Sequence, residues 1–231
     1  MQTESVHLEA SPLALLFLLP KIKGSDSKVR NKRTLFMVEV AIFAALATLL
    51  DFIPIFKMPQ GGSVSLAMIP VFLIAFRWGL KGGLLTGFLY GVFQIIVGQA
   101  YILTPLQAFI EYGLAFTALG LAGIFASTVK QSLINHNTKK FFTYVSLAIL
   151  LGSALRFFAH VVAGVVFFAE YTDAENIWLY SLGYNASYMV PAAIISALGL
   201  GYLFKKQPRI ILNDQEQASY RAAARPSEQI N

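Results

Sequence analysis

Six apolar stretches take up most of this chain and constrain its fold more than any other feature. They run over residues 35–56, 63–78, 79–98, 102–127, 141–168 and 177–204. About 20 apolar residues in a helix, at roughly 1.5 Å per residue, cover the hydrocarbon core of a membrane. Hydrophobic residues make up 56% of the chain and charged residues only 13%, which excludes an ordinary soluble protein. The sequence therefore predicts an all-α membrane protein with six transmembrane helices, the second of them short and containing Pro70.

Basic residues gather on one side of these predicted spans. On that side lie Lys28, Arg30, Lys32, Arg33, Arg77, Lys81, Lys130, Lys139, Lys140, Lys205, Lys206 and Arg209. The opposite side has Lys57 as its one cation, and its last loop carries Glu170, Asp173 and Glu175. Because cytoplasmic loops carry the excess of Lys and Arg, we expect both chain termini in the cytoplasm.

Three regions follow from this pattern. We expect residues 1–34 to be a disordered cytoplasmic extension, 35–206 to be the membrane domain, and 207–231 to be a polar, disordered cytoplasmic tail. The run SPLALLFLLP near the start is too short to span a membrane, and no small-residue cleavage site follows it. We therefore interpret it as part of the extension, or as the product of a misassigned start codon, and not as a signal peptide.

Glu111 is the single charged residue in the apolar stretch from Tyr101 to Ala126. A carboxylate at such a depth costs roughly 2.5–3.5 kcal/mol on insertion scales, so it is rarely kept without a partner or a ligand. His160, with Arg156 one turn deeper, and Asn185 also lie about eight residues in from one end of their stretches, a common depth of roughly 12 Å. These groups predict a buried polar pocket in the outer half of the membrane, open to the outside.

Arg156, His160, Gly164 and Phe168 are spaced by four and share one helical face. One interpretation makes Arg156 the buried counter-ion of Glu111 and His160 a core histidine. The other makes this face part of a ligand site, together with surplus polar and aromatic groups at Tyr101, Gln107, Tyr112, Tyr180, Asn185 and Tyr188. A carboxylate binds amino-substituted heterocycles and aromatic rings attract cations, so the ligand would be a small, flat, cationic or amine-bearing nutrient. Tyr101 and Tyr180 could alternatively anchor the membrane interface.

Several classes of function are excluded. The chain has no cysteine, and it lacks H-E-x-x-H, P-loop and G-x-G-x-x-G motifs, so we expect no enzyme, no metal site and no cofactor. Ser153 and His160 lie seven apart, but no serine-hydrolase motif surrounds the serine. The net charge of +6 is dispersed at helix ends, which argues against nucleic-acid binding. Energy for transport against a gradient would have to come from ions or from a partner.

Two sets of small residues lie on helical faces. Gly79, Gly83, Gly87 and Gly91 recur every four residues in the third stretch, a spacing that lets helices pack closely in lipid. We interpret this ladder mainly as internal packing, with an exchangeable interface as the alternative. Ala41 and Ala45 form a weaker pair on the first stretch.

The combined motifs resemble the thiamine-specific substrate-binding subunits (S components) of energy-coupling factor (ECF) transporters. The motifs are MPQGGSVSLAMIP, the glycine ladder leading into GQAYILTPLQAFIEYGLAF, then LRFFAHVVAGVVFF and YSLGYN, and they cover residues 35–206. The resemblance implies uptake of thiamine (vitamin B1) across a bacterial cell membrane. It also implies a transmembrane coupling subunit and two cytoplasmic ATPases as partners, besides membrane lipid.

By this resemblance, Glu111 binds the aminopyrimidine of thiamine with Tyr112 beside it. His160, Tyr180 and Asn185 complete the pocket, with Arg156 below and Gly164 leaving room for the ligand. Ala41 and Ala45 correspond to the family's A-x-x-x-A face against the coupling subunit. Members often have tryptophan where this chain has Phe168, and another in the loop where it has Gln60, Gly61 and Gly62. Two alternatives stay open: an S component for another vitamin, such as pyridoxine or riboflavin, and an ion-coupled secondary transporter.

Overall fold

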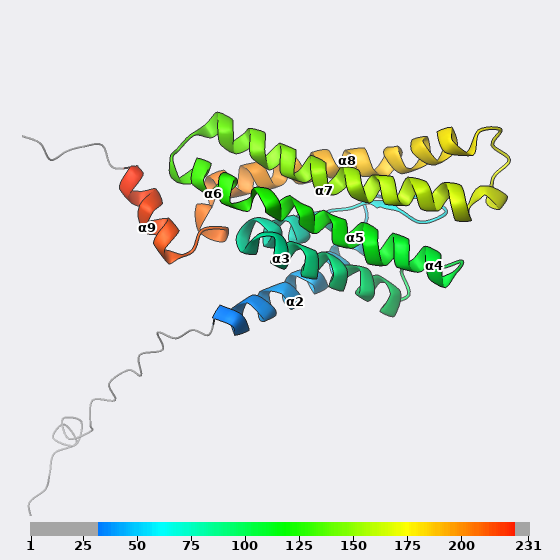
Figure 1. Cartoon of the computed structure of the whole chain (residues 1–231), viewed down its shortest axis with the longest axis horizontal. Coiled ribbons are helices and arrows are strands. Elements are labelled where there is room, and N and C mark those ends of the chain that lie inside the picture. Colours follow the sequence, from blue (N-terminus) through cyan, green and yellow to red (C-terminus); the bar gives the residue numbers. More distant parts are fainter. Residues whose placement is uncertain (1–31, 225–231) are drawn as a thin grey trace, which may run out of the picture. The chain divides into compact units, whose positions relative to one another are not determined.

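The computed structural model describes residues 32–224 of the chain. Residues 1–31, which hold nearly all of the predicted N-terminal extension, and residues 225–231 lie outside the described part. The long helices are α2 (Lys32–Asp51), α3 (Met68–Ile96), α7 (Thr138–Phe167) and α8 (Ile177–Lys206). A fifth continuous helical stretch, Pro105–Ile134, joins α4 (Pro105–Ala108), the π-helix η1 (Phe109–Leu114), α5 (Ala115–Ala118), the 3₁₀ helix η2 (Leu119–Phe125) and α6 (Ala126–Ile134). In Figure 1, α7 and α8 run side by side, and the stretch α4–α6 lies between α7 and α3.

The α3 helix reverses direction at Gly79. Gly79 has φ 74° and ψ −162°, a conformation outside the helical region that favours glycine. Beyond it, a Cβ on Gly83 would lie only 2.7 Å from the Cβ of Ala75, although residues eight apart in a straight helix are separated by about 12 Å. The halves therefore lie against each other, which confirms that the stretches 63–78 and 79–98 are separate helical segments. The first half, from Met68 to Trp78, rises only about 16 Å and is too short to cross a membrane alone.

The start of the second predicted span is wrong. Strand β1 (Phe56–Lys57) pairs in antiparallel fashion with β2 (Ser63–Val64), and the helix begins only at Met68. The strands are joined through Gly61 and Gly62, whose φ angles of 91° and 87° suit glycine and break any helix there. We call residues 52–67, which contain this hairpin, the hairpin loop.

The glycine ladder packs inside the protein. A Cβ on Gly83 would lie 2.7 Å from the carbonyl oxygen of Gly120, and one on Gly87 or Gly91 would clash with the carbonyl of Phe116 or Tyr112. These partners repeat with the same spacing along the stretch α4–α6, so the ladder lets α3 approach that stretch backbone to backbone. The interpretation of internal packing is confirmed.

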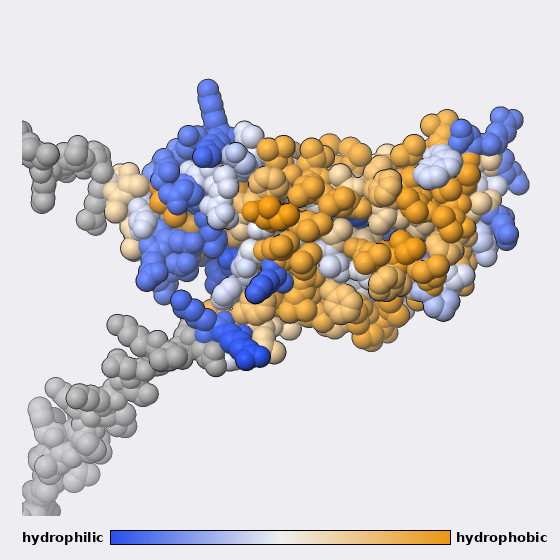
Figure 2. Space-filling view, viewed as in Figure 1, coloured by the Kyte–Doolittle hydropathy of each residue, from blue (hydrophilic) through white to orange (hydrophobic). Residues whose placement is uncertain are grey.

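The surface of the bundle suits a membrane. Figure 2 shows an apolar band over the helices, with hydrophilic residues gathered at its two ends. On α8, Leu198 is 70% exposed and Ile194 53% exposed, and large apolar side chains exposed in this way suit contact with lipid. Among the described residues, α2, the stretch Pro105–Ile134, α7 and α8 are each long and apolar enough to cross a membrane, and α3 meets the same criterion only when its two halves are counted together. The chain is a multi-pass membrane protein.

The expected disorder of the tail is wrong for its described part. After the 3₁₀ turn η4 (Pro208–Ile210), helix α9 (Asp214–Ala223) begins with a capping box between Asn213 and Glu216. Ile211 and Leu212 are each only 1% exposed and belong to the hydrophobic core. Lys130 Nζ lies 3.4 Å from a Glu216 carboxylate oxygen, which ties α9 to α6. The segment is polar on average, but its apolar residues Ile211 and Leu212 pack into the core and hold it against the helix bundle.

Candidate ligand-binding cavity

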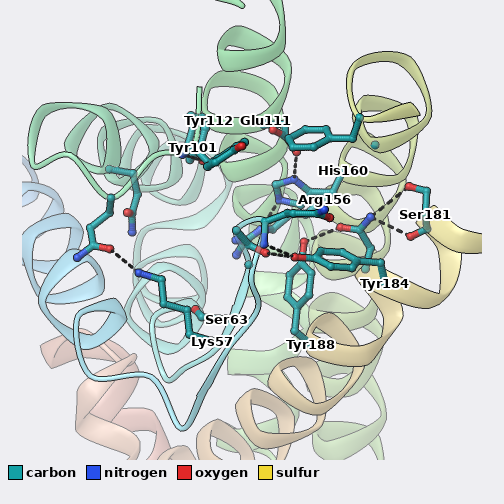
Figure 3. Close-up of a pocket in the computed structure, with 18 of the residues that line it drawn as sticks. Lys57, Ser63, Tyr101, Glu111, Tyr112, Arg156, His160, Ser181, Tyr184 and Tyr188 are labelled. Carbon is teal, nitrogen blue, oxygen red and sulfur yellow. Dashed lines mark hydrogen bonds and ion pairs between the residues drawn. The ribbon is translucent and has the colours of Figure 1, made fainter. Parts of the chain in front are cut away.

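One cavity lies between the hairpin loop and the helices α3, η1, α7 and α8, and Figure 3 shows the side chains around it. All nine residues predicted to bind a substrate line it. They are Tyr101, Glu111, Tyr112, Arg156, His160, Gly164, Phe168, Tyr180 and Asn185. The polar residues that the sequence places at a common depth therefore line one cavity.

Glu111 and Tyr112 project from the π-helix η1. The preceding turn is started by Thr104, whose hydroxyl accepts a hydrogen bond from Gln107 N, with Pro105 as the first helical residue. A π-turn holds more residues than an α-turn, so it redirects the side chains around it, and such turns are often found at functional sites. The carbonyl of Tyr112 lies directly against Gly91, so the glycine ladder sets the position of this turn.

The Glu111 carboxylate is held on both of its oxygens. Oε1 lies 3.2 Å from His160 Nδ1, and Oε2 accepts a hydrogen bond from Gln107 Nε2. Gln107 is completely buried; its Nε2 also donates to the carbonyl of Tyr101 and its Oε1 accepts from Leu103 N. A carboxylate oxygen accepts more than one hydrogen bond, so Glu111 keeps acceptor capacity toward the cavity that it lines.

Arg156 contacts His160 and forms no ion pair with Glu111 among the described residues. Its Nε donates to His160 Nε2 at 3.2 Å, and its guanidinium lies 4.2 Å from the ring centre of Phe116. Because arginine can only donate, His160 Nε2 must accept, which assigns the proton to Nδ1 and makes it the donor to Glu111. The alternative in which Arg156 directly pairs with Glu111 is therefore wrong: a neutral histidine connects the two charges.

Aromatic rings form the outer wall next to the acid. The Tyr101 and Phe168 ring centres are 5.8 Å apart with an interplanar angle of 31°. Tyr101 N donates to the Tyr112 hydroxyl at 2.7 Å, which fixes the loop before α4 onto η1. Tyr101 thus has contacts within the site in addition to any role at the membrane interface.

Helix α8 supplies the opposite wall. Asn185 accepts a hydrogen bond from the Tyr188 hydroxyl at 2.6 Å and donates through Nδ2 to Ser181 O at 2.9 Å. A Cβ on Gly164 would clash with Ser181 Oγ, so the missing side chain at Gly164 lets α7 and α8 approach each other. Gly164 therefore has a packing role that was not predicted, besides the room for a ligand that the family resemblance implies.

The hairpin loop closes the cavity through tyrosines of α8 (Figure 3). The Tyr184 hydroxyl accepts from Gln60 N and donates to Gly61 O, both at 2.9 Å. Tyr180 donates to Gln60 Oε1 at 3.3 Å. The chain therefore covers the cavity with loop backbone that is held by tyrosine hydroxyls.

Asp51, at the end of α2, is the main residue that sequence reasoning missed. Its Oδ1 accepts from Ser63 Oγ and Ser65 Oγ, both at 2.7 Å, and its Oδ2 accepts from Gln94 Nε2 at 2.6 Å. It lines the cavity and joins α2 to the hairpin loop and α3. Asp51 and Gln94 each stand within five residues of the end of an apolar stretch, and the similar depth of these two polar residues was the signal available.

A family model described as "Thiamine transporter protein" matches residues 37–212 of the chain. The chain belongs to this thiamine transporter protein family. Thiamine transporter ThiT of Bacillus subtilis (strain 168) is 43% identical over 189 residues, which cover 80% of this chain and 98% of that protein. ThiT of Lacticaseibacillus paracasei is 29% identical over 199 residues, covering 84% and 99%.

A solved structure of ThiT from Listeria monocytogenes has the same fold, with a TM-score of 0.75 and 35% sequence identity. The match covers 79% of this chain and 100% of that one. The predicted family and the all-α membrane fold are thereby confirmed. Members of the thiamine transporter protein family are transporters and not enzymes, as the sequence predicted.

Proposed function

We propose that this chain captures thiamine in the cavity around Glu111 and serves in its uptake. The observation that carries the proposal is the Glu111 carboxylate, held at the cavity wall by His160 and Gln107 with acceptor capacity left over. The family description and the two relatives named as thiamine transporters support the same ligand.

The chemistry of thiamine matches the two kinds of wall. Its aminopyrimidine carries an exocyclic amine that can donate to the Glu111 carboxylate, a charge-assisted hydrogen bond of the stronger class. Its thiazolium ring is a flat cation, which aromatic faces such as those of Tyr101 and Phe168 attract. Asn185 and the tyrosine hydroxyls of α8 offer further polar contacts.

Another vitamin fits less well. Two carboxylates, Glu111 and Asp51, line the cavity, and they favour the cationic thiamine over vitamins without a positive charge, such as riboflavin or pyridoxine, and over an anionic ligand. An ion-coupled secondary transporter would be expected to show paired repeats, and the sequence has none at a fixed period. The thiamine proposal is therefore preferred over both alternatives.

We infer that transport is driven by an ECF complex, with a membrane coupling subunit and two cytoplasmic ATPases. The sequence holds no nucleotide-binding motif, so the energy must come from elsewhere. Helix α2 presents an apolar face on which Ala41, Ala45 and Leu49 are exposed. Small residues on such a face suit close packing against another membrane helix.

The ligand that co-purifies with the protein tests the proposal. The full chain, expressed in cells fed with a vitamin mixture and purified in mild detergent, is denatured, and the released small molecules are identified by mass spectrometry. We expect thiamine in near-stoichiometric amount. Recovery of riboflavin or pyridoxine in its place would overturn the assignment of the ligand.

A further inference from the structure

A groove separate from the main cavity runs between α7 and α8 at the membrane end where α7 begins and α8 ends. Its lining is Phe142, Ser146, Ala197, Leu198, Tyr202, Lys205 and Lys206, and none of these residues lines the main cavity. We call it the basic groove. Gly201 shapes one wall, because a Cβ there would lie 2.9 Å from a ring carbon of Phe142, so the ring rests against the α8 backbone.

The basic groove joins positive charge to apolar surface. Lys205 Nζ lies 5.6 Å from the ring centre of Phe142, and Lys206 Nζ lies 5.9 Å from that of Tyr202. None of the lining residues is acidic, and the ion pairs of residues 32–224 involve neither lysine. Within residues 32–224, two ammonium groups therefore line one groove with no carboxylate in its lining and none in an ion pair with them.

The two kinds of surface lie at different depths. Lys205 and Lys206 occupy the last turn of α8, whereas Leu198 lies seven residues before Lys205, about 10 Å further into the membrane. Leu198 is 70% exposed on a helix that is long and apolar enough to cross a membrane, where lipid chains would be its neighbours. A molecule filling the groove must then combine an acyl chain with an anionic headgroup.

We propose that the basic groove binds one anionic phospholipid. The headgroup phosphate lies between Lys205 and Lys206, near the Tyr202 hydroxyl, and an acyl chain lies along Phe142, Ala197 and Leu198. Basic pockets between transmembrane helices select anionic headgroups in this way. The site would bias the lipid shell of the protein, and it does not depend on which ligand the main cavity takes.

Lysines at a helix end also attract anionic lipid without a specific site. Lys139 and Lys140 provide the control, since both are exposed at the same membrane end. Lys140 Nζ lies 5.9 Å from the ring centre of Tyr144, whose ring packs against Phe125 and does not line the groove. Removing Lys139 and Lys140 deletes the same charge and leaves the basic groove intact.

Native mass spectrometry of the full chain in detergent, titrated with phosphatidylglycerol or phosphatidylcholine of the same acyl chains, tests the proposal. We expect one tightly bound phosphatidylglycerol and weaker phosphatidylcholine. Lysine near an anionic surface contributes about fivefold in affinity, so Lys205→Gln with Lys206→Gln should weaken phosphatidylglycerol binding about 25-fold. Lys139→Gln with Lys140→Gln should change it less than about twofold, the scale of a screened surface charge.

A variant that keeps the charge tests the groove itself. Ser146 is exposed, so Ser146→Phe fills the groove without entering the core and should also weaken phosphatidylglycerol binding. Thermal unfolding of each variant verifies that the fold is kept. Equal losses from the two lysine pairs, or undiminished binding to Ser146→Phe, would show that anionic lipid collects at this end without using the groove and would overturn the proposal.

Discussion

Gly91 packs against the backbone carbonyl of Tyr112 so closely that a Cβ at Gly91 could not be accommodated. The last rung of the glycine ladder thus supports the π-turn that carries Glu111 into the cavity. The packing of α3 against η1 therefore helps to determine where Glu111 lies in the cavity.

Gly91→Ala should lower stability as well as ligand affinity. Overpacking a tight contact typically costs about 1–3 kcal/mol, and relief of the clash would displace η1 with Glu111. The matched control is Gly183→Ala, because Gly183 is helical in α8 and a Cβ there meets open space. Thermal unfolding in detergent should show a lower midpoint for Gly91→Ala and an unchanged or higher one for the control. Equal midpoints would contradict this account of the ladder.

Asp51→Asn should loosen the hairpin loop. Asparagine would place an N–H₂ group, which donates, where a carboxylate oxygen of Asp51 now accepts hydrogen bonds. The N–H₂ group would then face the donors of either Gln94 or the two serines, Ser63 and Ser65. A lost hydrogen bond to a charged group costs about 1.5–3 kcal/mol, so ligand dissociation should accelerate about tenfold or more. Stopped-flow measurement of thiamine release tests this, with Asp173→Asn, an exposed acid outside the cavity, as the control. An unchanged dissociation rate would show that Asp51 does not restrain the loop.

The membrane orientation can be tested with single cysteines, since the chain has none of its own. We expect the loop carrying Asp173 to face outward and the start of α7 to face the cytoplasm, because basic residues mark the inner side. On intact cells, impermeant maleimide should label Asp173→Cys and leave Lys139→Cys unlabelled until the cells are lysed. The reverse pattern would place the cavity on the wrong side for uptake.

Ala41→Trp with Ala45→Trp should separate binding from transport. Both alanines are exposed on α2 and neither lines the cavity, so thiamine affinity should stay within about 1 kcal/mol of the unmodified protein. Bulk on this face should block close packing with a coupling subunit and abolish ATP-dependent uptake. Normal uptake by the double variant would show that this face is not the docking surface.

Much of the site was predictable because depth in a membrane helix can be counted along the sequence. Glu111, His160 and Asn185 each stand about eight residues from the same membrane face, and the fold brings them to one cavity. Residues in the hairpin loop have no such count, so the cover formed by Gln60 and Gly61 could not be derived from spacing. The depth of Asp51 could be counted, but its serine partners in that loop could not.

Other features depend on tertiary contacts that leave little local pattern. The sequence around Glu111 predicts an ordinary α-helix. The π-turn found there is held in place by a contact with another helix, between Gly91 and the carbonyl of Tyr112. The tail after Gln207 is polar on average, yet Ile211 and Leu212 are buried in the core. The average composition predicts disorder there, but the burial of these two apolar residues orders the segment.

The most direct test of the central claim is calorimetric titration of thiamine into the purified protein and its Glu111→Gln variant. The amide keeps the shape of the side chain but removes the charge that the ligand amine would meet, so we expect affinity to fall by about 1.5–3 kcal/mol, or roughly tenfold to a hundredfold. Glu170→Gln, at an exposed acid that does not line the cavity, should bind as the unmodified protein does. Equal affinity of Glu111→Gln and the unmodified protein would remove Glu111 from the site and contradict the account.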